Sequence, residues 1–316
     1  MRASRLLPVI VIMAVVAATL AAGYSASAKK PVGYVGSEEC LLCHEDTHAS
    51  LIQAWMKTAH HHAMTDVSEN PKGVAADFGC EDAPFKLEQV AYVLGVGKDY
   101  QNFLDKDLKL LPGTWLVDEK KWVEQEAVDG ATQCVGCHTT GFDPESKTWT
   151  ELGVGCESCH GPGADHSESM EASDITNLRK LDAKHQDMIC GQCHAVGTDL
   201  SGKLAFSTTF RPGNDLDKHF KLTEPEPGAA NSQYNEFVNS NHAKHGMKCT
   251  SCHDTHGDKA KAAHQLKQPV NTLCMACHSI SLGETEAVES MESHAPGSEP
   301  TDTCATCHMI DASHDF

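Results

Sequence analysis

The pentapeptide Cys-x-x-Cys-His occurs seven times in this chain, and it constrains the fold more than any other feature. Two thiols on one tight turn can add to the two vinyl groups of a porphyrin, and the histidine that follows then lies under the iron as its proximal ligand. The copies are Cys40/Cys43/His44, Cys134/Cys137/His138, Cys156/Cys159/His160, Cys190/Cys193/His194, Cys249/Cys252/His253, Cys274/Cys277/His278 and Cys304/Cys307/His308. The repeat predicts seven covalently bound haem c groups, each with its iron.

Two other readings of the cysteines are possible. A bare Cys-x-x-Cys pair also occurs in zinc sites, in redox-active dithiols and in disulfide frameworks. None of these requires a histidine directly after the second cysteine, and all seven copies have one. Cys80 is the fifteenth cysteine, and it is expected to be a buried thiol or to pair with another chain.

The N-terminal stretch has the layout of a secretory signal peptide over residues 1–28. Arg2 and Arg5 precede the apolar run Leu6–Ala22, and Ala26-Ser-Ala28 offers a small-residue cleavage site. An uncleaved membrane anchor is the alternative, because the run approaches the length that spans a bilayer. We expect cleavage and a periplasmic or extracellular protein.

The charge balance narrows the range of partners. A formal charge of −19 disfavours binding to nucleic acid and to anionic membrane surfaces, and it favours basic surfaces on redox proteins. Aromatic residues make up 6% of the chain, which is little for a core of this size. Seven porphyrins would supply much of the missing apolar surface.

Composition and the positions of the haem motifs divide the chain into four parts. After residues 1–28 comes an N-terminal haem segment over 29–79, then a haem-free, β-rich insert over 80–130, then a multihaem domain over 131–316. Alternating apolar residues such as Val90, Tyr92 and Leu94 predict short strands near residues 85–125. Helices are expected near 174–188, 232–244 and 284–293. The predicted fold is mainly α, with extensive irregular loops wrapped around covalently bound haems and a small β insert.

Several motifs resemble the cytochrome c-554-type multihaem family. They are Trp55-x-x-Thr-x-His60, Gly153-Val-Gly-Cys156-Glu-Ser-Cys-His160-Gly-Pro-Gly-Ala-Asp-His166, Phe237-x-x-Ser-x-His242 and Cys252-His-Asp-Thr-His256. The resemblance implies an electron-transfer protein with closely packed haems, most of them ligated by two histidines. The founding type carries four haems, whereas this chain has seven attachment motifs.

Thirteen histidines remain once the seven proximal ones are set aside. Those in the family motifs are expected to be distal ligands, and further positions are chosen near the remaining haem motifs. The predicted distal set is His60, His166, His185, His242, His256, His294 and His314. His48, His219 and His264 are held in reserve.

Two histidines on each iron fill both axial positions, which favours electron transfer over catalysis. We therefore expect no catalytic residues and an electron carrier between redox proteins, such as other cytochromes, a quinol-oxidising complex or a terminal reductase. The chain could serve anaerobic respiration or extracellular electron transfer, as part of an envelope conduit or a filament.

Two alternatives remain open. One is a multihaem reductase or oxidase of a small nitrogen or sulfur compound, which needs one five-coordinate haem. The Cys-x-x-Cys-Lys motif that marks the active haem of many nitrite reductases does not occur in the chain. The other is a structural role in which the insert acts as a docking surface.

Overall fold

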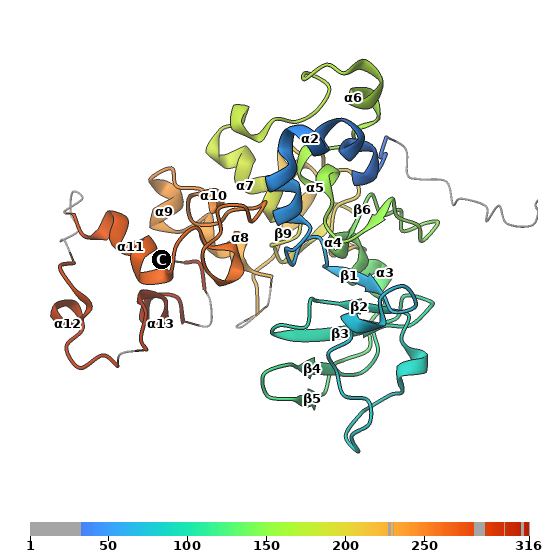
Figure 1. The fold of residues 1–316 in the computed structure, drawn as a ribbon, viewed down its shortest axis with the longest axis horizontal. Helices are drawn as coiled ribbons and strands as arrows, with labels where there is room; N and C mark the ends of the chain where they lie inside the picture. The colour runs from blue at the N-terminus through green and yellow to red at the C-terminus, as the bar shows by residue number, and fades with distance from the viewer. Residues whose placement is uncertain are drawn as a thin grey trace, which may run out of the picture.

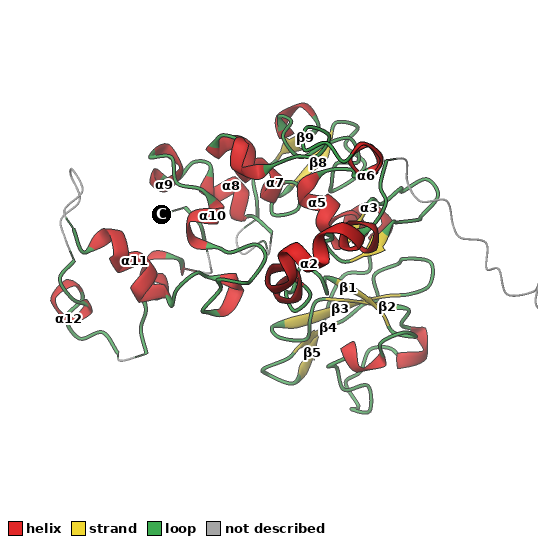
Figure 2. Ribbon diagram, turned by 45° about the horizontal axis from the view of Figure 1, so that its top comes forward, coloured by secondary structure: helices red, strands yellow, loops and turns green. Residues whose placement is uncertain are grey.

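The computed structural model describes residues 33–226, 229, 231–280, 288–299, 301–310 and 313–315. The predicted signal peptide and residues 284–287 of the helix predicted over 284–293 lie outside these residues. Short helices, small sheets and long irregular connections make up the fold (Figures 1 and 2). Among the helices described, none has both the length and the apolar character needed to cross a membrane.

Most helices are only one or two turns long. The longest of those described is α2 (Ser37–Trp55), which has 19 residues and a kink at His48. The other α-helices are α3 (Gly130–Gln133), α4 (Val135–His138), α5 (Cys156–His160), α6 (Ala164–Ser169), α7 (Ala183–Gly191), α8 (Gln233–Phe237), α9 (Asn241–Lys244), α10 (Cys249–Cys252), α11 (Val270–His278), α12 (Met291–His294) and α13 (Cys304–His308).

Capping residues explain where two of the predicted helices begin. The helix expected from residue 174 starts only at Ala183, because the Asp182 carboxylate accepts from the backbone N–H of His185 and caps α7. The helix expected over 232–244 is divided, because Ser240 caps α9 by accepting from the Ala243 N–H. Sequence periodicity alone did not locate these starts.

One five-stranded antiparallel sheet forms in the region where strands were predicted. Its strands follow chain order: β1 (Met64–Asp66), β2 (Tyr92–Leu94), β3 (Tyr100–Leu104), β4 (Thr114–Leu116) and β5 (Lys121–Val123). Two further sheets have two strands each, pairing β6 (Thr139–Thr140) with β7 (Glu151–Leu152) and β8 (Gly197–Asp199) with β9 (Phe220–Leu222). The large sheet therefore extends earlier in the chain than the predicted insert.

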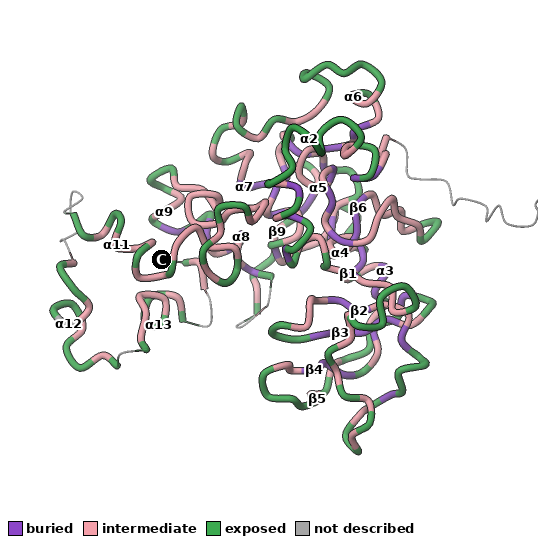
Figure 3. The backbone as a smooth tube through the Cα atoms, viewed as in Figure 1, coloured by how far each residue is buried: buried purple, intermediate pink, exposed green. Residues whose placement is uncertain are grey.

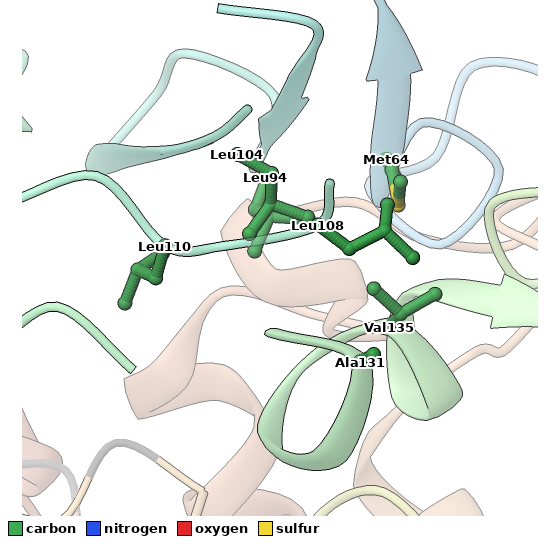
Figure 4. Packing of buried hydrophobic residues seen from close by; sticks show 7 residues of the cluster. All are labelled: Met64, Leu94, Leu104, Leu108, Leu110, Ala131 and Val135. Atoms are coloured by element: carbon green, nitrogen blue, oxygen red, sulfur yellow. The ribbon is translucent and has the colours of Figure 1, made fainter. Parts of the chain in front are cut away.

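Both faces of the five-stranded sheet are buried. Val93 and Phe103 are register partners that join Trp115 in an aromatic-rich cluster on one face. Leu94 and Leu104 belong to a cluster on the opposite face, because successive side chains of a strand point to opposite sides. This second cluster is completed by Met64, Leu108, Leu110, Ala131 and Val135 (Figure 4).

The second cluster joins the sheet to a haem motif. Val135 follows Cys134 directly and is fully buried against the sheet residues. Figure 4 shows Val135 and Ala131 on the helical turns that face the leucines of the sheet. The haem-free insert and the second Cys-x-x-Cys-His motif thus share one apolar core.

A third cluster surrounds the fourth motif, with Met188 and Ala195 on either side of it along the chain. Phe210, Leu216, Phe220 and Tyr234 complete this cluster. No described residue after Ser240 is buried. The described part of the chain after Ser240, which carries three of the motifs, therefore lacks an apolar core of its own.

Candidate haem sites

Each Cys-x-x-Cys-His motif forms a site, numbered 1 to 7 in chain order. Most of the motifs lie on helical turns, as at α5 for site 3 and at α13 for site 7. Residues three apart share a helix face, so the two cysteines of such a turn present their thiols to the same side. All fifteen cysteines are free of disulfide bonds.

The predicted attachment cysteines are not equally enclosed by the protein. All fourteen have the same motif spacing. In the structure, Cys43, Cys277 and Cys307 are exposed, whereas the other eleven are partly buried. Each of the three is the second cysteine of its motif. They belong to site 1, at the start of the described chain, and to sites 6 and 7, in the segment without buried residues. The pattern predicts a thiol's spacing from its partner, but how far the chain covers it depends on the tertiary packing.

For these three exposed cysteines, haem attachment is inferred from the sequence motif and not from burial. Cys43, Cys277 and Cys307 are candidate haem-binding residues through the motif spacing alone, because their thiols are exposed. Attachment to a vinyl group depends on the spacing of the two cysteines and on the histidine that follows, and it does not require burial. The three cysteines are therefore kept as proposed haem links, at sites whose haem edge would face solvent.

Backbone carbonyls orient several of the proximal histidines. The Nδ1–H of His138 donates to the Ala63 carbonyl at 2.8 Å, that of His160 to Thr176 at 3.0 Å, and that of His253 to His264 at 2.8 Å. A hydrogen bond at Nδ1 leaves Nε2 as the free nitrogen, which is the arrangement that metal-bound histidines use. Site 4 differs, because Nδ1 of His194 lies 3.3 Å from the side-chain Oε1 of Gln233.

Histidine rings from other segments face three proximal histidines at one distance and nearly parallel. Ring centres are 6.3 Å apart for His44 with His166, for His160 with His256 and for His253 with His314, at interplanar angles of 19°, 22° and 24°. Metal–nitrogen bonds to imidazole are about 2 Å long, so two rings on opposite sides of one metal have centres about 6 Å apart. The residues at sites 1, 3 and 5 therefore fit an iron held between two histidines.

Three more pairs have similar separations, and two of them have steeper ring angles. Ring centres are 6.1 Å apart for His60 and His194, and 5.8 Å apart both for His242 with His278 and for His294 with His308. The six opposing histidines are His60, His166, His242, His256, His294 and His314, all of them in the predicted distal set. They come from segments both before and after the motifs that they face.

Burial keeps several of these rings neutral. It is the main cause that lowers the pKa of His60 to about 4, with the neighbouring His194 and His253 adding to the shift. Burial likewise lowers the pKa of His138, His160 and His194. Since a metal binds the neutral imidazole, these environments suit ligands.

His185 was predicted as a distal ligand, but the structure does not place it opposite a proximal histidine. Its Nδ1 lies 2.8 Å from the Asp182 carboxylate and its Nε2 lies 3.4 Å from that of Asp215. Both ring nitrogens are thus engaged by carboxylates, one from the N-cap of α7 and one from the residue before Leu216. His185 is accordingly left out of the ligand set proposed below.

Site 2 is the exception among the seven. Within the described part of the chain, no histidine ring makes a contact with His138 like those at the other six sites. The reserve candidates do not fill this position. His48 contacts His44 edge-on at 5.5 Å, His219 bonds to Thr209, and His264 offers its backbone carbonyl to His253.

Contacts between cysteines of different motifs show which sites are neighbours. A hydrogen bond joins the thiols of Cys40 and Cys156, and it lowers the pKa of Cys156 to about 7. Cys137 and Cys193 are joined in the same way, which raises the pKa of Cys193. Site 1 therefore adjoins site 3, and site 2 adjoins site 4.

Further thiol contacts extend this order. A hydrogen bond from Cys190 raises the pKa of Cys249, which places site 4 beside site 5. Burial and then Cys304 raise the pKa of Cys274 to about 11, which places site 6 beside site 7. Weaker electrostatic effects of Cys190 on Cys159 and of Cys277 on Cys252 link sites 3 with 4 and 5 with 6. The attachment sites form a row in the order 1, 3, 4, 5, 6, 7, with site 2 beside site 4.

The carboxylate of Glu157, inside the third motif, fixes the start of the described chain against site 3. It accepts from the backbone N–H groups of Val35 at 3.0 Å, Gly36 at 2.7 Å and Gly163 at 2.7 Å. Its side chain is 1% exposed, so these bonds replace the water that it loses. Cys80 is partly exposed, not buried as expected, and its thiol contacts the Asp77 carbonyl at 3.3 Å.

Comparisons with known proteins agree with the motifs. A family model described as cytochrome c554 and c-prime matches residues 113–161, and a model of a doubled Cys-x-x-Cys-His motif matches residues 242–280. Cytochrome c-554 of Nitrosomonas europaea is 30% identical over 226 residues, which cover 65% of this chain and 76% of that protein.

Two other similarities are more distant. The dissimilatory sulfite reductase MccA of Wolinella succinogenes is 26% identical over 211 residues, which cover 56% of this chain but only 27% of that protein. The crystal structure of the outer cell wall cytochrome OcwA matches the fold with a TM-score of 0.68 at 23% identity, over 88% of this chain and 77% of that one. The fold is therefore that of a multihaem cytochrome.

Proposed function

Because the chain belongs to the cytochrome c-554 family and is a multihaem c-type cytochrome, we propose that it is a heptahaem electron carrier between redox proteins. The cofactors supply the one-electron redox chemistry when bound. Attachment is proposed at all seven motifs, with the fourteen cysteines as thioether links and the seven following histidines as proximal ligands.

The observation that carries this proposal is the set of six opposing histidine pairs. Their ring centres lie 5.8–6.3 Å apart, the separation needed to hold one metal between two rings. We assign His60, His166, His242, His256, His294 and His314 as the distal ligands. An iron with two histidines has no position left for a substrate, so these six sites suit electron transfer.

The arrangement of the sites supports the same function. Thiols of neighbouring motifs come into hydrogen-bonding contact at sites 1 and 3 and again at sites 4 and 5. Such contacts bring the porphyrin edges attached there close together. The chain would therefore hold a continuous row of redox centres from its N-terminal to its C-terminal segments.

We further propose that the protein acts in the periplasm or outside the cell, after removal of residues 1–28. The resemblance in fold to an outer cell wall cytochrome supports a location outside the cytoplasm. Donor and acceptor belong to the classes expected above, a quinol-oxidising complex or another cytochrome on one side and a terminal reductase or envelope conduit on the other.

A redox titration together with intact-protein mass tests the proposal. The protein, matured with its haems, should carry seven haems, and all should be reduced and reoxidised reversibly. Most midpoint potentials should lie below that of the hydrogen electrode, because histidine gives lower potentials than a methionine ligand. Fewer than seven haems per chain, or haems that do not exchange electrons with the rest, would refute it.

A second candidate function rests on site 2. His138 is oriented by Ala63 but faces no second histidine in the described residues, so its iron would keep an open position. A reductase of a small nitrogen or sulfur compound needs such a position, and the distant similarity to a sulfite reductase is in keeping with it. Turnover of sulfite, nitrite or hydroxylamine with a reduced mediator, lost in a His138→Met variant that keeps its haems, would favour the enzyme.

A further inference from the structure

Site 1 lies at one end of the proposed row, so the surface around it is where an external partner can approach most closely. The inference below rests on the proposed electron-transfer function. The seven motifs share one sequence pattern, but the residues between their cysteines differ in exposure.

The two residues between the cysteines point away from the shared face of the thiols, because they lie on the other side of the helical turn. At site 2 the first of them is Val135, which is fully buried, and at site 3 the first of them is Glu157, which is 1% exposed. At site 1 the residue at this first position is Leu41, which is partly buried, and the second residue is Leu42, which is 77% exposed. Leu42 is the only large exposed apolar residue at these positions among the seven described motifs.

Carboxylates surround this leucine, and no basic side chain accompanies them in the two segments that form the site. Residues 33–56, which include α2, contain no lysine or arginine, and residues 160–178, which include α6, contain none either. The exposed acids of the two segments are Glu38, Glu39, Glu45, Asp46, Asp165, Glu168, Glu171 and Asp174. Figure 3 shows much of α2 and the chain around α6 as exposed.

The two segments meet at site 1 itself. His44 on α2 and His166 on α6 have ring centres 6.3 Å apart, so the acids of both helices border the same haem site. Cys43 is exposed beside Leu42, so the haem edge attached there would be open to a partner on this face. An exposed apolar residue within a ring of like charges is the composition of a transient docking surface, in which charge steers the encounter and the apolar contact holds it.

We propose that this face, formed by Leu42 and the carboxylates of α2 and α6, docks a redox protein that presents lysines or arginines around an apolar spot. A basic partner is specified because the two described segments of the face offer eight acids and no cation. A second copy docking through the same face is disfavoured, since the same acids would then oppose each other.

Voltammetry and mass adsorption on a gold electrode can test this with a defined probe, a monolayer of mixed amine- and methyl-terminated thiols. The charge variant is Glu45→Gln/Asp46→Asn/Glu168→Gln, which removes three exposed carboxylates of the face. Its matched control is Glu81→Gln/Glu88→Gln/Asp118→Asn on the β insert, with the same change in charge. Leu42→Ser is paired with Leu200→Ser, because Leu200 is 66% exposed and lies far from site 1 in the chain.

At low ionic strength, the charge variant should exchange electrons with the monolayer about tenfold more slowly and adsorb less, while its control stays near the parent. Leu42→Ser should slow exchange about threefold and Leu200→Ser should not. High salt should bring the parent and the charge variant together. Haem content by mass and the visible spectrum establish that each variant is loaded.

Equal losses in the charge variant and its control would overturn the proposal, because net charge and not this face would then control binding. A dimer of the parent that the charge variant abolishes would assign the face to a second copy and contradict it as well. If the proposed electron-transfer function itself were wrong, the result would differ from both of these outcomes. Neither the parent nor any variant would then show reversible reduction on any monolayer.

Discussion

At the scale of single residues, hydrogen bonds to the proximal histidines are a means of adjusting the iron. Three of them are made to backbone carbonyls, which no substitution of a side chain can remove. His194 instead faces the side-chain oxygen of Gln233. Site 4 is therefore the place where a side chain can set the basicity of the ligand.

Replacing Gln233 with Glu should lower the midpoint potential of site 4. A carboxylate at Nδ1 increases the basicity of the ligand and stabilises the oxidised iron. A gain of about 1 kcal/mol corresponds to about 40 mV for a one-electron couple. A spectroelectrochemical titration measures the shift, and Gln125→Glu on the insert is the control for charge alone. Equal shifts in the two variants would contradict the assignment.

The Glu157→Gln substitution should destabilise the contact between the N-terminal segment and site 3. An amide retains one acceptor oxygen, and its NH₂ group would face the N–H of Gly36 or Gly163, each 2.7 Å from a carboxylate oxygen. A buried donor left opposite another donor costs about 2–3 kcal/mol.

Guanidinium denaturation measures this cost, with Glu168→Gln on the exposed surface of α6 as the control. The control should change the free energy of unfolding by less than about 0.5 kcal/mol. If Glu157→Gln were as stable as the control, the hydrogen bonds of this carboxylate would not hold the segment in place.

The sequence predicts the attachment cysteines and proximal histidines of a site more reliably than its distal histidine. Cysteines and proximal histidines follow from a local spacing, so their positions need no knowledge of the fold. A distal histidine depends on which remote segment lies opposite. His60 illustrates this, because it faces His194 and not the motif of its own segment. His185 lies near site 4 in the chain, yet Asp182 and Asp215 hold its ring elsewhere.

The motif also does not predict how far the protein buries a thiol. Cys43 and Cys307 have the same spacing as the partly buried Cys159 and Cys193, yet the structure leaves both exposed. Burial of the second cysteine is decided by whether a distant segment packs on the turn, and the pentapeptide does not contain that information.

At the scale of elements, the five-stranded sheet shows what periodicity can and cannot predict. Alternating apolar residues predicted strands in this region, and β2 to β5 lie there. β1 was not predicted, because Met64 is its only apolar residue and Met64–Asp66 therefore shows no apolar alternation. The packing of the sheet on the turn around Val135 depends on contacts between distant residues, and no local pattern specifies them.

The C-terminal elements α11 to α13 should depend on their haems for order. None of the described residues in them is buried, so little apolar contact holds them once an attachment is lost. A Cys304→Ser/Cys307→Ser variant should lack the haem at site 7 and become sensitive to a glutamate-specific protease at Glu289 and Glu299. Residues 33–240, which contain the three apolar clusters, should resist.

Limited proteolysis followed by mass measurement checks this, with Cys80→Ser as the control that removes a thiol outside the motifs. Equal resistance of the variant and the control would show that α13 is held by contacts other than those of its haem.

At the scale of the whole molecule, both ends of the row carry the same charge. Beyond Lys267 the chain contains no lysine or arginine, and eight acids follow, at Glu284, Glu286, Glu289, Glu292, Glu299, Asp302, Asp311 and Asp315. Site 1 at the other end is acidic too. Like charges at both ends oppose end-to-end assembly of copies and leave each end open to a basic partner.

The protein should therefore sediment as a monomer at low ionic strength, where repulsion between the ends is strongest. Analytical ultracentrifugation at about 10 mM and at about 500 mM salt, concentrations chosen to give Debye lengths of about 30 Å and about 4 Å, measures this. Filaments that are stable in low salt would contradict the prediction and favour assembly through the terminal sites.

The central claim is that six of seven irons are held by two histidines and that site 2 is open. An electron paramagnetic resonance spectrum of the fully oxidised protein, quantified against its haem content, tests this most directly. The account predicts six low-spin haems for each high-spin haem, and the high-spin signal should respond to a small ligand such as nitric oxide. Seven low-spin haems would show that site 2 is closed by a second ligand, and several high-spin haems would contradict the histidine pairs themselves.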